Sequence, residues 1–505
     1  MKNKKILFAV IGAAAVLVGV MLLLIFMPKN CGGDTSAESD LATADEARIT
    51  VSTDSNGVHQ AVVGRNGKGE VEQNGSGKLM EYYPADISQI HIENPKGTLD
   101  VISNTPEGEA TVYTIKGYED LELQASVPDE IASAAASLDF SVVAGRDNGN
   151  NSADFGLDNP RSVVTVTYND KTKSVITVGA DAPQQAGTYV KFGDGEDIYV
   201  VDSERAKVFD YGLTDLVSLT INDSAADTET GKASSIKIYG NVPEDIELVP
   251  NDSQKVSASY RLTSPVECYA NEKESSLIEG GIRGLYADSV VMVNPSETQL
   301  VNLGLAESAV RLTAVYPDTT VELIGSKPDP NGNVKLMVAG GSIVYSLPLS
   351  KVEWVETGYE KLVSEYALNP KLTALSKMTV SSGGGEYGFD LKSKTVVTTD
   401  DEGSETESTT TAVFYNGREL QNESFSPVFE NAGLIELADA KTEEPSGTPE
   451  LTITYTYADD GSYDTLEFYP SSDNRCLAVL NGRAEGHSRQ SDITRFVNSL
   501  NELLS

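Results

Sequence analysis

The sequence SVVTVTYND, residues 162–170, decides the fold, because its apolar and polar residues alternate as they do in a half-buried β-strand. The same pattern returns as AVRLTAVYPD at residues 309–318 and as LTITYTYADD at residues 451–460. Each copy reaches a tyrosine and then a polar turn, and a second alternating segment follows. A pattern that recurs at a wide, nearly even spacing indicates tandem repetition, so we expect three copies of one structural unit.

Further alternating segments surround each copy and extend the repeat. A second strand is expected after each tyrosine, at residues 175–178, 321–324 and 465–469. The first two copies continue into a strand pair with a glycine-containing turn and the third into one matching segment, at residues 188–201, 334–347 and 476–482. Upstream strands are expected at residues 90–92, 236–238 and 378–380. Equivalent strands should therefore end at Tyr168, Tyr316 and Tyr457.

Helices are expected between the upstream strands and the tyrosine strands, at residues 128–138, 272–285 and 424–433. The last helix of the chain is the clearest, with one apolar face formed by Ile493, Phe496, Val497, Leu500 and Leu504. The sequence thus predicts an α+β, predominantly β protein. It should contain three tandem units of antiparallel strands with one or two helices each, at residues 81–222, 230–369 and 370–505.

The N-terminal segment has the features of a membrane anchor. Residues 6–27 are apolar and uncharged, and Lys2, Lys4 and Lys5 precede them. At about 1.5 Å per residue, a helix over this run reaches about 33 Å, which crosses a hydrocarbon core of about 30 Å. The lysines favour a cytoplasmic start, so residues 1–5 are predicted as a cytoplasmic tail. A single-pass protein of the cell membrane follows, with its C-terminal part extracytoplasmic.

A cleaved secretory signal and a lipoprotein signal with Cys31 as the lipidated residue are the alternatives. The apolar run is longer than the about 7 to 15 residues of a signal core, and Lys29 and Asn30 precede Cys31 where a lipoprotein signal has small residues. These features favour a retained anchor. Residues 28–80 are rich in Gly, Ser, Asn, Asp and Thr and are predicted to be a flexible stalk with at most one loose hairpin.

The charge and the cysteines limit the partners. The formal net charge is −38, which disfavours nucleic acid and anionic lipid headgroups as partners and suits a soluble, solvated surface. Cys31, Cys268 and Cys476 have no metal-ligand spacing. We expect Cys268 and Cys476 to be small buried residues, with a disulfide between them as the alternative.

No catalytic constellation is found in the sequence. None of His59, His91 and His487 has a partner at the spacing of a metal ligand or a general base, and the common metalloprotease, phosphate-loop and nucleophile-elbow motifs are missing. Trp354 could form a ligand platform, but packing against its own sheet is the favoured interpretation. We assign no catalytic residue and no cofactor.

Two acidic clusters are the weak candidates for a metal site. They are Asp194, Glu196 and Asp197 in GDGED, and Asp459, Asp460 and Asp464 in ADDGSYD. Several carboxylates on a glycine turn suit calcium. Because both segments lie between alternating strands, where Asp-Gly is the common hairpin signal, the favoured interpretation is a plain turn. The acidic insert at residues 398–411 is expected to be a mobile surface loop.

The sequence FGLDNPRSVVTVTYND at residues 155–170 and TYVKFGDGEDIYVVD at residues 188–202 resemble the bacterial domain of unknown function 4340 family. The likeness is best in the first unit, lacks the Asn-Pro pair in the second and is weakest in the third. It implies a membrane-anchored, extracytoplasmic protein, often encoded beside ABC-transporter components of the gliding-motility type. The family offers no catalytic residues to transfer.

These observations favour a non-enzymatic extracytoplasmic scaffold or interaction protein, an accessory of an ABC-transporter or envelope complex. Its expected partners are the membrane, through residues 6–27, and other envelope or transporter proteins. The alternative from another class is an envelope-modifying hydrolase that uses paired carboxylates, since 76 acidic residues offer many candidate pairs. A hydrolase would need two acids that converge in one cleft.

Overall fold

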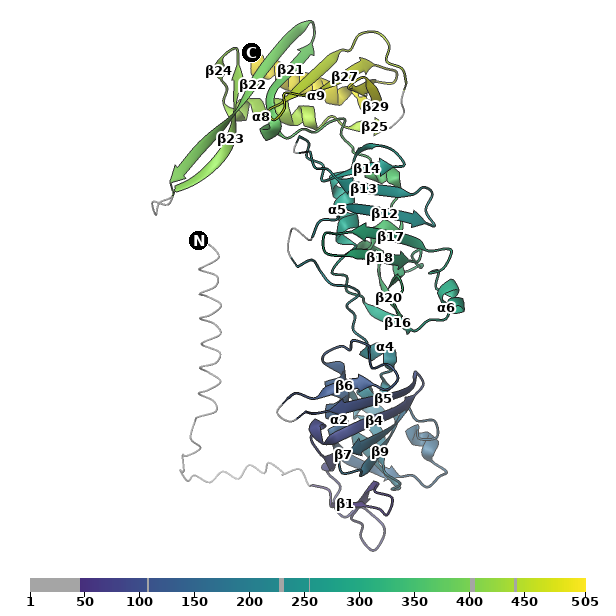
Figure 1. Ribbon diagram of the computed structural model, residues 1–505. Helices are drawn as coiled ribbons and strands as arrows, with labels where there is room; N and C mark the ends of the chain where they lie inside the picture. The colour runs from purple at the N-terminus through teal and green to yellow at the C-terminus, as the bar shows by residue number, and fades with distance from the viewer. Residues whose placement is uncertain (1–45, 107–108, 227–230, 254, 400–404, 440–442) are drawn as a thin grey trace.

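The computed structural model describes residues 46–106, 109–226, 231–253, 255–399, 405–439 and 443–505 (Figure 1). These residues are predominantly β and form three nine-stranded antiparallel sheets and one two-stranded sheet, which confirms the predicted fold class at this level. The predicted tail at residues 1–5 and transmembrane helix at residues 6–27 lie outside the described residues. In the part of the chain that the structure describes, no helix is long and apolar enough to cross a membrane.

The first sheet and its helices form the first unit. Its strands are β3 (Gly77–Glu81), β4 (Ile87–Asn94), β5 (Gly97–Asn104), β6 (Val112–Ile115), β7 (Ser137–Arg146), β8 (Ser162–Tyr168), β9 (Lys173–Asp181), β10 (Thr188–Phe192) and β11 (Asp197–Val201). Its helices are η1 (Pro84–Asp86), α2 (Val127–Ala136), η2 (Ser152–Phe155), η3 (Pro183–Gln185), α3 (Ser203–Lys207), η4 (Val208–Asp210) and α4 (Leu213–Leu216).

The second unit follows, with strands β12 (Ser235–Gly240), β13 (Ile246–Pro250), β14 (Tyr260–Ser264), β15 (Cys268–Tyr269), β16 (Ser289–Val293), β17 (Val310–Val315), β18 (Thr320–Gly325), β19 (Asn333–Val338) and β20 (Ile343–Pro348). Its helices are α5 (Glu272–Gly280), α6 (Glu297–Asn302), η5 (Leu349–Lys351), η6 (Glu353–Val355) and α7 (Tyr359–Leu362). The two units are joined by the chain after α4.

The third unit has strands β21 (Leu375–Ser382), β22 (Gly385–Thr399), β23 (Glu405–Tyr415), β24 (Arg418–Glu419), β25 (Leu437–Asp439), β26 (Leu451–Tyr457), β27 (Tyr463–Pro470), β28 (Arg475–Leu480) and β29 (Arg483–Arg489). Its helices are η7 (Leu372–Ala374), α8 (Asn422–Gly433) and α9 (Gln490–Leu504). The helices expected from the sequence are thus present as α2, α5, α8 and α9.

The three sheets share one strand order. The first is β3-β7-β11-β10-β9-β8-β4-β5-β6. The other two, taken from the matching edge, are β16-β20-β19-β18-β17-β12-β13-β14-β15 and β25-β29-β28-β27-β26-β21-β22-β23-β24. Eight strands therefore correspond in every sheet. The ninth strand is β3 at one edge of the first sheet, and β15 or β24 at the opposite edge of the other two.

The repeated tyrosines occupy equivalent places in this order. The strands β8, β17 and β26 each lie between two equivalent neighbours. On one side they pair with β4, β12 and β21, and on the other with the next strand of the chain, β9, β18 and β27. Tyr168 and Tyr457 are the last residues of their strands, and Tyr316 directly follows its strand. All three side chains are buried. The sequence repeat is therefore a repeat of topology.

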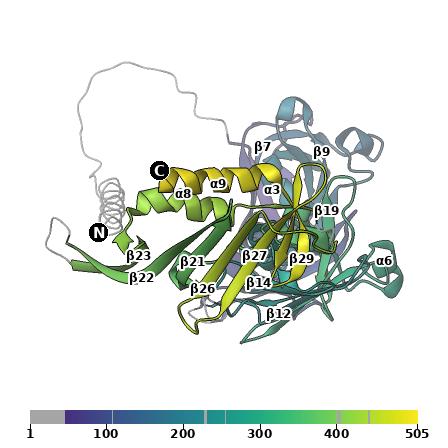
Figure 2. The ribbon, with the colours of Figure 1, turned by 90° about the horizontal axis from the view of Figure 1, so that it is seen from above.

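Each sheet buries one face against helices. In β8 and β26, every second residue is fully buried, as the alternating sequence requires. Figure 2 shows α8 and α9 side by side over the third sheet. Ile493, Phe496 and Leu500 of α9 are buried in the third core, which confirms the apolar face expected for this helix.

The linkers between the units are extended segments that pair with both neighbours. After α4, Ser218 N donates to Glu122 O of the first unit at 2.8 Å, and Leu219 O accepts from Ala287 N of the second unit at 2.8 Å. The pattern repeats after α7. Ser364 N donates to Tyr269 O of the second unit at 3.1 Å, and Glu365 O accepts from Leu437 N of the third unit at 2.6 Å. Each linker thus ties two sheets together through backbone hydrogen bonds.

The segment expected to be a flexible stalk packs on the first unit wherever it is described. Residues 46–80 contain the hairpin of β1 (Ile49–Thr53) and β2 (His59–Val63), and β3 joins the first sheet by pairing with β7. Ala61 and Val63 are buried in the first core. The hairpin expected within this segment is thus present, and it packs on the first sheet because the short apolar alternation of β2 is buried there.

The acidic insert also differs from its prediction. The strands β22 and β23 form one long hairpin, with Thr399 paired to Glu405, and it extends beyond the rest of the third sheet (Figure 1). Residues 398–399 and 405–411 are thus strand and not loop, while residues 400–404 lie outside the described part. Threonine and valine favour strands, and here this preference outweighs the run of charge.

Candidate functional site

The first acidic cluster is neutralised by arginines. Asp197 is 7 % exposed and forms an ion pair with Arg65 of the N-terminal segment, and Arg146 lies 3.8 Å from it. Glu196 pairs with Arg146. Asp194 lies in the turn between β10 and β11, and its backbone N–H donates to Gln60 Oε1 of β2. This cluster fixes the N-terminal segment to the first sheet and does not assemble a carboxylate cage.

The second acidic cluster contacts the second unit. Lys255 Nζ lies 2.8 Å from Asp460 Oδ2 and 3.8 Å from Asp459 Oδ1, and it sits 4.8 Å from the centre of the Tyr457 ring. The hydrogen bond from Lys255 is the main cause of a lowered pKa at Asp460. Asp464 accepts a 2.6 Å hydrogen bond from the Tyr457 hydroxyl. The cluster is thus a contact between units, which its sequence does not reveal because Lys255 is far away in the chain.

Neither cluster forms a metal site. Among the described residues, no group of three or more His, Cys, Asp or Glu side chains could hold a metal ion. Trp354 is fully buried in the second core and donates from Nε1 to Gly281 O at 2.9 Å, so it packs against α5 and is no open platform. Cys476 is a buried free thiol, as expected, while Cys268 is a free thiol that is only partly buried, so the alternative of a disulfide between them is wrong.

Two histidines have carboxylate partners that their sequence spacing hides. His91 Nδ1 lies 2.7 Å from Asp100, and this hydrogen bond is the main cause of its raised pKa. Burial alone would lower the pKa of His487, but Asp439 at 2.9 Å and Glu443 at 3.3 Å outweigh it and raise the pKa. The His91 pair was predictable, since the tight β4–β5 turn places the two residues opposite each other.

His59 has hydroxyl partners instead. Its ring lies within 3.2 Å of hydroxyl groups of Thr53, Tyr82 and Thr172, and the Tyr82 ring stacks on Tyr168 with centroids 3.9 Å apart. Burial lowers the pKa of His59 and so favours the neutral ring. This histidine therefore anchors the β1–β2 hairpin to the first unit through hydrogen bonds to its neutral form.

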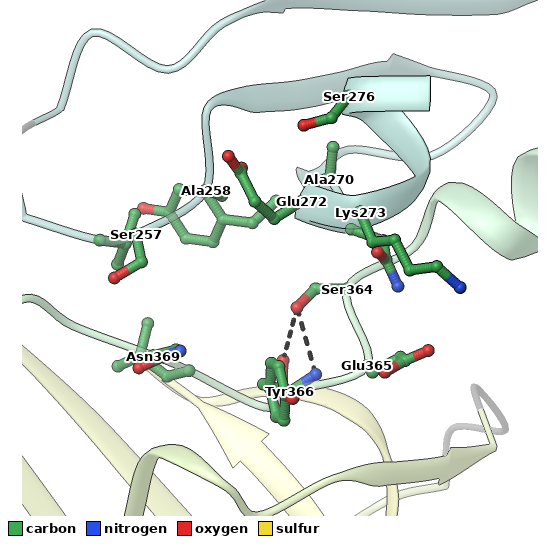
Figure 3. A pocket seen from close by; sticks show the side chains of 14 residues that line it. Ser257, Ala258, Ala270, Glu272, Lys273, Ser276, Ser364, Glu365, Tyr366 and Asn369 are labelled. Carbon is green, nitrogen blue, oxygen red and sulfur yellow. Dashed lines mark hydrogen bonds between the residues drawn. The ribbon is translucent and has the colours of Figure 1, made fainter. Parts of the chain in front are cut away.

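One pocket lies between the second and third units. It has a volume of about 520 Å³, and Figure 3 shows its two walls. One wall is formed by the start of α5 and the chain before β14, and the other by the linker after α7. It is lined by Val256, Ser257, Ala258, Tyr269, Ala270, Asn271, Glu272, Lys273, Ser276, Ser364, Glu365, Tyr366, Leu368 and Asn369. A smaller pocket of about 280 Å³ lies nearby and shares Tyr269, Ser364 and Tyr366.

The two acids of this lining do not converge. Both oxygens of Glu272 accept hydrogen bonds from Ser259, at 2.6 Å from its backbone N and 2.6 Å from its hydroxyl. Glu365 lies on the opposite wall, on the linker (Figure 3). Ser364 Oγ hydrogen-bonds the backbone of Tyr366 and so stiffens that wall. The pocket offers a place for a small molecule, and its two carboxylates do not point toward each other (Figure 3).

Residues 113–259 match the family model described as Domain of unknown function (DUF4340), which confirms the resemblance for this stretch. The match runs from β6 of the first unit to the residues before β14 of the second, so it crosses the first junction. No curated protein and no solved structure matches the chain.

Proposed function

We propose that this chain, whose residues 113–259 carry a domain of unknown function, acts by contact: it is a membrane-anchored extracytoplasmic scaffold or interaction protein. The observation that carries this proposal is the repetition of eight equivalent strands in three sheets, joined by paired linkers, without two acids that point toward each other in the main pocket. A repeated structural unit provides binding surface and length, but it does not by itself provide a reacting group.

The acidic residues support this assignment. In a carboxylate hydrolase, one acid is held protonated and a second faces it across the substrate. Here most of the candidate acids pair with Arg65, Arg146 or Lys255, or accept hydrogen bonds from Ser259 or Tyr457. Those acids are therefore stabilised as structural groups.

The location and partners belong to the proposal. An anchor at residues 6–27 would hold the three units outside the membrane, where an ABC transporter or another envelope complex is the partner class that the family resemblance suggests. Tethering would raise the effective concentration of the units near such a partner without a tight interface.

Complementation of a deletion strain tests the choice between contact and catalysis. The double variant Glu272→Gln/Glu365→Gln and the single variant Asp194→Asn should both retain the cellular role, because amides preserve the shape of the surface. Loss of the role in the double variant, with unchanged circular dichroism and normal protein level, would favour the hydrolase.

Membrane topology has a separate test. Ser76 is exposed, and a cysteine placed there in a thiol-free chain should react with a membrane-impermeant maleimide in intact cells once any outer barrier is opened. Labelling only after lysis would reverse the proposed orientation.

A further inference from the structure

The junction between the second and third units differs from the first junction at matching positions. Thr220 bridges Tyr286 in the first junction, and Tyr366 bridges Glu436 in the second. Thr220 and Tyr366 are therefore equivalent linker positions. The residues before them, Leu219 and Glu365, correspond to each other, and so do the residues after them, Ile221 and Ala367.

Large aliphatic side chains fill the first junction. Leu219 packs against the core of the second unit, and Ile221 is buried in that core. Leu121 and Leu213 of the first unit pack against the same core. The first junction is thus a closed apolar contact, as expected where two domains are held rigidly together.

The second junction has a polar and a small residue in the same places, and a cavity results. Glu365 replaces the leucine and lines the 520 Å³ pocket, while Ala367 replaces the isoleucine and lines the smaller pocket beside it. Well-packed interiors leave few voids larger than a water molecule. The second junction thus has room for a ligand at the place where the related first junction is filled by side chains.

The lining defines the chemistry of that ligand. Tyr269, Tyr366, Leu368 and Val256 provide apolar and aromatic surface. The hydroxyl and carboxamide groups of the lining can donate and accept hydrogen bonds, and within the described residues no hydrogen bond engages the side chains of Ser257, Ser276 and Asn369. Such a site suits a ligand with an apolar face and a rim of hydroxyl groups.

Charge at the rim disfavours an anionic ligand. Glu272 and Glu365 stand there together with Lys273, whose Nζ lies 3.6 Å from Glu274 (Figure 3). An anion would meet two carboxylates on a chain with a formal charge of −38, and a cationic probe tests a cation separately. The volume lies within the range of about 300–1,000 Å³ typical of small-molecule sites.

We infer that the pocket between the second and third units is a binding site for a small neutral saccharide, and that its ligand bridges the two units. The sugar ring packs its C–H face on the tyrosines, and its hydroxyl groups bond to Asn271, Asn369 and the serines of the lining. This inference does not depend on a membrane anchor or on a protein partner.

Titration calorimetry on the purified full-length chain tests the inference, with cellobiose and N,N′-diacetylchitobiose as neutral probes. At least one should bind saturably with one site per chain. Glucose 6-phosphate, spermidine and the peptide Leu-Val-Ser serve as anionic, cationic and peptide probes, and should bind at least about tenfold more weakly than the best saccharide.

Two variants close the pocket in different ways. Glu365→Leu installs the side chain of the first junction, and Ser276→Phe places a ring on an exposed turn of α5 at the pocket mouth. Each should weaken saccharide binding at least about tenfold, while Glu244→Leu, on an exposed turn of the second unit, should leave it unchanged. Binding that survives in both closed variants, or binding of an ionic or peptide probe alone, would overturn the inference, as would the failure of both saccharides to bind.

Discussion

At the scale of single residues, the polar groups singled out by the sequence have structural partners. Asp197 is buried against Arg65, and Asp460 contacts Lys255 of another unit. These partners lie far apart in sequence, so no local spacing could have predicted them. What the sequence did predict at this scale is the alternation that buries Tyr168 and the packing of Trp354.

The contact between Lys255 and Asp460 should stabilise the second junction by a modest amount. Both side chains remain partly exposed, and solvent screens such pairs. A double-mutant cycle of Lys255→Ala and Asp460→Asn, measured by chemical unfolding, should therefore give a small, stabilising coupling energy. Asp194→Asn, in an exposed turn, is the control and should change stability by no more than about 0.5 kcal/mol. A coupling energy of zero would contradict the contact between Lys255 and Asp460.

His487 should make stability depend on pH in one direction. Its pKa in the folded chain is raised above the ordinary value of 6.5, so protonation strengthens folding. The contribution is fully present below pH 6.5 and is lost as the pH rises through the folded pKa. The difference in unfolding free energy between the wild type and His487→Asn should therefore shrink from pH 6 to pH 8. A difference that grows over this range would contradict the assigned partners.

His59 should act in the opposite direction. Burial lowers its pKa below 6.5, so its contribution is present above pH 6.5 and is lost as the pH falls through the lower folded value. The destabilisation caused by His59→Asn should be largest near pH 8 and should shrink on acidification. Equal destabilisation at all pH values would mean that His59 does not titrate with folding.

At the scale of elements, the joint before the first tyrosine strand depends on glycine. Gly156 has φ +68°, and a Cβ there would lie 2.7 Å from Ala180 N. Gly117, in the same unit, has φ +83° with open space around a Cβ. The two glycines thus share the conformational strain of a substitution but differ in the steric clash.

Gly156→Ala should therefore destabilise the first unit more than Gly117→Ala. The shared strain costs about 1–2 kcal/mol, and the clash with the backbone of Ala180 adds to the first variant only. Differential scanning calorimetry of the two variants measures the effect on the transition of the first unit. An equal loss in both would show that the chain relaxes freely at this joint.

The sequence predicted the elements well where alternation was long, and poorly where composition was used instead. The strands β8, β17 and β26 and the helix α9 follow directly from periodicity. The long hairpin of β22 and β23 and the packing of β1–β3 on the first sheet do not follow from the sequence, because these segments are acidic or rich in glycine. Pairing with a neighbouring strand provides hydrogen bonds that composition cannot indicate.

At the scale of the whole molecule, the two linkers define how the units are held. Only the structure shows that Ser218 and Ser364 each donate a backbone hydrogen bond to the unit before them, at 2.8 and 3.1 Å. The pocket of the second junction was equally hidden, since it depends on which side chains two distant segments bring together.

Removing the backbone donor at the second linker should loosen the molecule. Ser364→Pro deletes the N–H that binds Tyr269 O, and proline cannot replace it. Small-angle scattering should show a broader distribution of distances for this variant. Ser364→Ala keeps the backbone donor and should scatter like the wild type. Identical scattering from the proline variant would mean that the linker does not hold the two units in place.

The most direct measurement tests whether the protein must be anchored to the membrane to perform its cellular role. The described units, residues 46–505, are expressed in a deletion strain once with residues 1–45 and once behind a cleavable secretion signal, at equal amounts outside the membrane. Release lowers the effective concentration at a membrane-bound partner, so we expect the anchored chain to restore the cellular role and the released chain to fail. Full restoration by the released chain would contradict the proposed function.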